Sequence, residues 1–164
     1  MASTVYRGSD GTISVAVESG VEGDKAKTVN DAYALTPIGR VTGVTLRVTN
    51  DVEPFHELGQ RFPTELRPGN INVYGSIERA YINGALLKLM LGDAADSRPA
   101  ATFVSPSFNL SVRLENPSLP GTTSTVTVIG VKLEEWNYDL PEDDFAMEKV
   151  NFRALWVKVE DKAA

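Results

Sequence analysis

The chain has 164 residues, a formal net charge of -6, 42% hydrophobic residues and no cysteine. This length fits one domain with a core of its own and is short for two. The acidic balance argues against a basic surface for tight nucleic-acid binding, and the lack of cysteine excludes disulfides, thiol nucleophiles and cysteine-ligated metal sites. No segment resembles a signal peptide or has the roughly 20 apolar residues of a membrane span, so we expect cytoplasmic production and no membrane insertion.

The first part of the chain predicts one strand followed by irregular structure. Residues 12–17 alternate apolar and polar side chains, which is the period-2 pattern of a half-buried strand. Residues 18–31 combine glycines with charges of both signs, which indicates a flexible loop or arm. A short strand is one interpretation of residues 33–38, which contain Pro37 near their end.

Two long strands are predicted next, over residues 41–50 and 70–81, because both segments alternate and are rich in β-branched residues. Each would extend roughly 30 Å, which is longer than most strands in globular proteins. The pair therefore predicts a ribbon that projects beyond a small core.

The loop between these strands, residues 51–68, is long for a connection in a compact domain. It is also unusually apolar for a loop in water. Two interpretations stay open: the loop folds back over its own core, or it docks on a neighbouring chain. We favour docking, and the candidate contact residues in the loop are Phe55, Leu58, Phe62, Pro63 and Leu66.

The segment from Asn83 to Gly92 predicts a short helix, since Asn83 suits an N-cap, Gly92 suits the C′ position, and Lys88 is the one charged residue between them. A helix that is apolar on almost every side has to be buried on almost every side. We expect it to plug one end of the sheet or to pack between subunits.

Further strands are predicted over residues 107–115, 122–131, 133–140 and 145–159. The last of these is apolar on both faces, which implies burial from both sides and adds Leu155 and Val157 to the candidate contact residues. The polar tail, residues 160–164, is expected to fray.

Together these elements predict a mainly β fold, an antiparallel β-sandwich or partly open β-barrel with one short buried helix and extended loops. Residues 1–164 form a single domain in this interpretation.

Few residues of the sequence are candidates for catalysis or metal binding. His56 is the single histidine, and no serine elbow or phosphate-binding loop accompanies it. The acidic turn Glu142–Asp144 lacks the alternating ligands and central glycine of a calcium loop and is interpreted as a solvated surface. We therefore expect no enzymatic activity and no cofactor.

Several short segments form a recognisable series along residues 38–154: Val41–Leu46, Glu57–Gly59, Pro68–Asn70, Gly75–Arg79, the apolar helix and the closing hairpin Leu140–Phe152. Taken in this order, they resemble the tail tube proteins of tailed bacteriophages and archaeal tailed viruses. The order and spacing of the segments are more specific than any single motif.

This resemblance implies a virion structural protein whose subunits form hexameric rings that stack into a hollow tail tube, made in the host cytoplasm. It implies central strands that line a channel for double-stranded DNA without binding it specifically, and extended loops that join rings. The candidate channel-lining residues on the polar strand faces are Thr45, Arg47, Asn72, Ser76 and Glu78.

The partners implied are further copies of the chain, a tail sheath or tail terminator, the baseplate and a tape-measure protein. Two alternatives stay open. One is the inner tube of a genome-free contractile particle, a tailocin. The other, from a different class of protein, is a small β-sandwich binding module.

Overall fold

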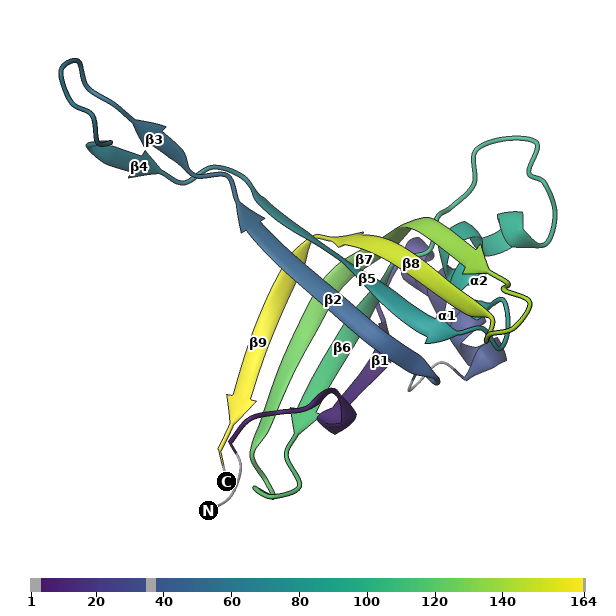
Figure 1. The fold of residues 1–164 in the computed structure, drawn as a ribbon. Helices are drawn as coiled ribbons and strands as arrows, with labels where there is room; N and C mark the ends of the chain where they lie inside the picture. Colours follow the sequence, from purple (N-terminus) through teal and green to yellow (C-terminus); the bar gives the residue numbers. More distant parts are fainter. Residues whose placement is uncertain (1–3, 35–37, 164) are drawn as a thin grey trace.

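In the computed structural model, which describes residues 4–34 and 38–163, seven strands form one antiparallel sheet that curls into a half-barrel (Figure 1). The strand order is β1-β6-β7-β8-β5-β2, and β9 pairs with β7 beside this path. The mainly β fold predicted from the sequence is confirmed. The strands of the sheet are β1 (Gly11–Val17), β2 (Val41–Asn50), β5 (Ile71–Ala80), β6 (Phe108–Glu115), β7 (Thr123–Asp139), β8 (Met147–Ala154) and β9 (Trp156–Lys162).

β7 connects the two halves of the sheet. Residues 123–128 pair with both β6 and β9, whereas residues 132–139 pair with β8. Gly130 turns the strand with a φ of 71°, and a Cβ there would lie 2.7 Å from the Leu155 side chain. The predicted division of this part of the chain is wrong. Residues 122–131 and 133–140, predicted as two strands, fall on the single bent strand β7, and residues 145–159, predicted as one strand, form β8 and β9 with a break at Leu155.

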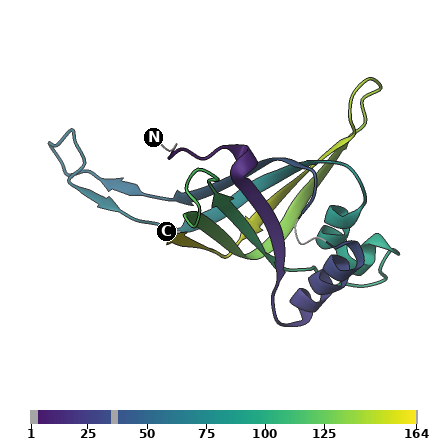
Figure 2. The ribbon, with the colours of Figure 1, turned by 90° about the horizontal axis from the view of Figure 1, so that it is seen from below.

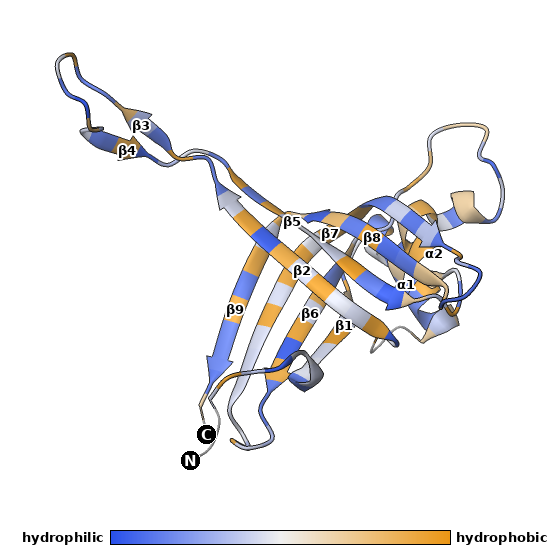
Figure 3. Cartoon of the chain, in the orientation of Figure 1, coloured by the Kyte–Doolittle hydropathy of each residue, from blue (hydrophilic) through white to orange (hydrophobic). Residues whose placement is uncertain are grey.

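The core is built from alternate apolar residues of the strands, which alternate with polar residues as bands of different colour along the ribbon (Figure 3). Ile77 of β5 is paired with Val150 of β8, and both are buried. Phe152 packs over Gly75, where a Cβ would lie 2.8 Å from the Phe152 ring. The close approach of strand and ring therefore requires glycine at this position.

Two helices, α1 (Val21–Tyr33) and α2 (Ala85–Leu91), pack together at one end of the sheet (Figure 2). The expected plug at one end is thus made by α2 together with α1. The prediction of a loop or arm over residues 18–31 is wrong, because most of that segment is α1. Its buried face is made of small side chains, and a Cβ at Gly23 would lie 2.1 Å from the carbonyl oxygen of Glu18.

Short 3-10 helices, η1 (Gly8–Asp10) and η2 (Gly92–Ala95), precede β1 and follow α2. The prediction of a frayed tail is wrong for residues 160–162, which pair with residues 123–125 of β7. The possible strand over residues 33–38 falls partly on residues 35–37, which lie outside the described residues, as does Ala164.

Between β2 and β5 the chain forms a second, two-stranded sheet, β3 (Glu53–Phe55) and β4 (Glu65–Arg67). This hairpin extends away from the half-barrel in both views (Figures 1 and 2). Every residue from 51 to 71 is exposed. The interpretation that residues 51–68 fold back over the core of their own chain is therefore wrong.

A buried polar network links three strands to α2. The Arg79 guanidinium of β5 pairs with the Glu148 carboxylate of β8, and both side chains are almost fully buried. Trp136 Nε1 donates to the other Glu148 oxygen at 2.9 Å. Arg79 also donates to Asn83 Oδ1 at 3.2 Å, and that oxygen accepts the Ala85 amide at the start of α2. The network thus holds the N-terminus of α2 against the sheet.

We predict that Arg79→Met lowers the free energy of unfolding by about 3–5 kcal/mol, because it leaves the Glu148 carboxylate buried without a cation. The matched control is Lys149→Met, since Lys149 and Glu78 occupy the next register position of the same two strands on the exposed face. The Lys149→Met variant should lower the free energy of unfolding by less than about 1 kcal/mol. Urea unfolding measures both, and equal losses would contradict a special role for the buried pair.

We also predict that the hairpin is dispensable for folding. Replacing residues 52–69 with Asn-Gly should change the free energy of unfolding by less than about 1 kcal/mol, because the removed residues are exposed and Asp51 already lies beside Asn70 (Asp51 N to Asn70 O, 2.9 Å). Chemical denaturation followed by circular dichroism checks this. A loss of several kcal/mol would show that the hairpin supports the core.

Candidate assembly surfaces

The β3–β4 hairpin presents its apolar side chains to solvent. Leu58 is 106% exposed and Phe62 is 84% exposed, and the sequence-predicted contact residues Phe55, Pro63 and Leu66 are exposed as well. A monomeric soluble protein rarely exposes apolar residues so densely on one projecting segment. The hairpin is therefore a candidate surface for contact with another chain.

The remaining two candidate contact residues lie at the junction of β8 and β9. Leu155 is 84% exposed, and its amide donates to the Ile129 carbonyl at 3.0 Å. Val157 is half-buried against the core. The junction of β8 and β9 lies on the half-barrel, away from the projecting β3–β4 hairpin, so it belongs to a separate surface (Figure 1).

The five candidate channel-lining residues share one face of the sheet, opposite the core. Thr45 is directly paired with Ser76, and Arg47 is paired with Tyr74. Asn72 and Glu78 lie on the same face of β5, since they are separated from Ser76 by even numbers of residues. We call the face that these residues define the polar face.

The polar face continues across β8 and the later part of β7, which sequence analysis had not assigned. Ser76 is paired with Asn151, whose side-chain amide donates to Glu135 at 3.0 Å. Arg153 donates to Glu134 at 2.7 Å, and Lys149 lies 3.7 Å from Glu78. Strand register places four cations and four carboxylates on the polar face, so its charges balance: Arg47, Lys132, Lys149, Arg153, Glu78, Glu134, Glu135 and Asp139.

The strands that carry the polar face end in two open edges. β2 is the last strand in the sheet order and pairs only with β5. Residues 132–139 of β7 pair only with β8, because the pairing of β7 with β6 stops at Val131. Among the described residues, nothing pairs with the outer side of either edge, which leaves a four-stranded ribbon with backbone groups available on both sides.

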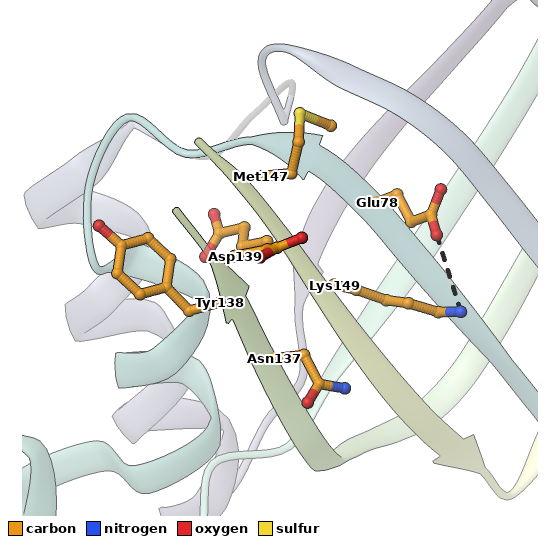
Figure 4. Close-up of a pocket in the computed structure, with 7 residues that line it drawn as sticks. Glu78, Asn137, Tyr138, Asp139, Met147 and Lys149 are labelled. Atoms are coloured by element: carbon orange, nitrogen blue, oxygen red, sulfur yellow. Dashed lines mark ion pairs between the residues drawn. The ribbon is translucent and has the colours of Figure 1, made fainter. Parts of the chain in front are cut away.

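A shallow depression of about 480 Å³ lies near the β7–β8 turn, between the end of β5 and the ends of β7 and β8 (Figure 4). Asp139 and Tyr138 line it from β7, and Glu78 and Lys149 line it from β5 and β8. The acidic turn at residues 142–144 connects β7 to β8 beside it. Large apolar side chains exposed at this end include Ile82, Leu140 and Phe145.

Titratable groups give little sign of a chemical site. His56 is exposed on the hairpin, and no group of three metal-binding side chains was found among residues 4–34 and 38–163. The pKa of Lys88 is raised above its ordinary value by its hydrogen bonds to Asp96 and Tyr33. In the described part of the chain, no helix is long and apolar enough to cross a membrane.

Comparison with known proteins identifies similar structures but no sequence relative. No protein-family model matches the chain, and no curated protein matches it. A chain of the sheath/tube terminator of the PVC extracellular contractile injection system matches with a TM-score of 0.62 and 13% identity, over 96% of this chain and 98% of that chain. The SPP1 tail tube matches with a TM-score of 0.61 and 10% identity, over 98% and 81%.

A chain of the six-fold symmetrised baseplate of the anti-feeding prophage also matches, with a TM-score of 0.53 and 21% identity, over 74% of this chain and 78% of that chain. These solved structures are of a sheath/tube terminator, a tail tube and a baseplate. The chain therefore has the fold of tail tube proteins, as the resemblance in its sequence predicted.

Proposed function

We propose that this chain is the subunit of a viral tail tube, a structural protein that forms hexameric rings stacked into a hollow conduit for double-stranded DNA. The observation that carries the proposal is the pair of open edges on a four-stranded ribbon whose outer face is polar. The fold shared with the SPP1 tail tube supports the same conclusion.

The ring would form where the edges of neighbouring ribbons meet. Unpaired backbone donors and acceptors along β2 of one subunit would face those along residues 132–139 of β7 in the next. A contact between two different edges is heterologous, so repetition closes into a ring when the rotation between subunits fits. Six-fold closure is supported by the six-fold particle in which a chain of this fold is found.

The polar face would then line the channel. DNA carries about one negative charge per 1.7 Å of its axis, so a basic lining would hold it through many phosphate contacts. Here the cations of the polar face are matched by carboxylates, and two of them are already paired with Glu78 and Glu134. A balanced, hydrogen-bonded lining offers DNA few phosphate contacts, which is the property that sliding requires.

The position of a tube within a particle indicates which proteins would contact the chain. We propose that it contacts further copies of itself, a sheath or terminator, a baseplate and a tape-measure protein, and that it resides in the virion tail. The match to the contractile injection system supports a second candidate, the inner tube of a genome-free contractile particle such as a tailocin. The presence of packaged DNA in particles that contain the chain separates the two candidates.

We predict that the purified 164-residue chain assembles into hollow tubes of uniform diameter with six subunits per ring, visible by electron microscopy of negatively stained samples. Sedimentation of the same sample should show large species whose amount rises with protein concentration. A single monomeric species at high concentration, with no rings on the grid, would overturn the proposal and favour the small β-sandwich binding module.

A further inference from the structure

We propose that the tip of the β3–β4 hairpin of one copy docks at the β7–β8 turn of another copy, with Arg61 beside the acidic turn. This inference rests on the proposed function, because it names the surface that receives the hairpin when rings stack. The two surfaces are the hairpin tip, residues 56–63, and the turn surface, which comprises Ile82 and residues 138–145.

The hairpin tip combines large apolar side chains with a single arginine. Leu58 and Phe62 are almost fully exposed, and Arg61 lies between them in sequence. Within the described part of the chain, no ion pair or hydrogen bond engages the Arg61 guanidinium, whereas Arg67, nearer the base of the hairpin, pairs with Glu65 at 3.4 Å. Glu57 is the other charged residue of the tip. The surface that receives the hairpin tip should therefore offer both apolar side chains and carboxylates.

The turn surface offers both. Leu140 is 64% exposed and Phe145 is 79% exposed, on either side of three consecutive acids, Glu142 to Asp144. Ile82 lies next to them, because the Tyr81 amide donates to the Ala146 carbonyl at 2.9 Å. Asp139, which also lines the depression beside the turn, adds a fourth carboxylate to this surface. Its chemistry thus complements the apolar side chains and the arginine of the tip.

The placement of the two surfaces suits head-to-tail stacking. The hairpin extends from the end of β2 and the start of β5, whereas the turn surface lies at the opposite ends of β5, β7 and β8 (Figures 1 and 2). A surface at one end that fits a different surface at the other end generates an open, repeating stack. The contact therefore extends a tube rather than closing a dimer.

A second depression, between β1 and the start of β2, is the competing site for the hairpin. It is lined by apolar residues such as Ile13, Val41 and Leu114, and Arg40 is the only charged residue in its lining. An arginine-bearing tip would meet another cation there without a carboxylate to offset it. Charge complementarity therefore selects the turn surface.

Because the chain has no cysteine, single thiols can report the contact directly. Gln60→Cys protein, mixed with Glu142→Cys protein and treated with a short bis-maleimide, should give a heterodimer across the two variants. The matched control mixes Gln60→Cys with Thr42→Cys, which places the second thiol at the competing depression. We expect at least about tenfold more cross-linked product with Glu142→Cys. Equal or reversed yields, or no cross-linking in either mixture, would overturn the proposal.

Charge reversal provides an independent readout. Arg61→Glu or Asp143→Arg alone should leave rings intact but shorten the tubes severalfold in electron micrographs, and the combined variant should restore tube length. Long tubes in both single variants would overturn the docking proposal while leaving the tube function standing. Cross-linking at Glu142→Cys without hollow tubes would support the docking contact and refute the tube function.

Discussion

The sheet of this protein curls without closing, and the unpaired backbone along its edges constrains everything else. Each backbone N–H and C=O needs a partner, and an exposed edge that is long and regular pairs readily with another strand. β2 and the later part of β7 both present such edges, at the two sides of one four-stranded ribbon. In the proposed assembly, neighbouring subunits pair with these edges. The exposed features of the chain therefore fit contacts between subunits better than a catalytic site.

The ribbon can serve as a wall because its two faces differ and its interior is fixed. The core face is apolar and contains the buried Arg79–Glu148 pair, which joins adjacent strands and holds α2 through Asn83. The opposite face carries short polar side chains and balanced charges. Strand alternation separates the two chemistries at every second residue, so a single ribbon can bury a core on one side and face a wet channel on the other.

Sequence reasoning recovered the elements whose periodicity is strong. The strands near residues 12–17, 41–50, 70–81 and 107–115 were predicted correctly because their apolar residues alternate. α1 was missed because glycine and alanine form much of its buried face, so the helical period has little apolar signal. The Arg79–Glu148 pair was missed although both residues fall in the apolar phase of their strands, where opposite charges can pair inside a core. The extension of the polar face onto β8 and β7 depended on strand register, which sequence alone does not supply.

The central claim is that the polar face lines the channel of an assembled tube. The most direct test compares the reactivity of two cysteine variants in assembled tubes, Ser76→Cys on the polar face and Ser111→Cys, which lies on the face of β6 turned away from the core. Both serines are half-buried in the single chain, so differences in tubes report assembly. With a bulky polyethylene-glycol maleimide, the account predicts slow labelling of Ser76→Cys and fast labelling of Ser111→Cys, with equal rates after denaturation. Equal rates in intact tubes, or faster labelling of Ser76→Cys, would contradict it.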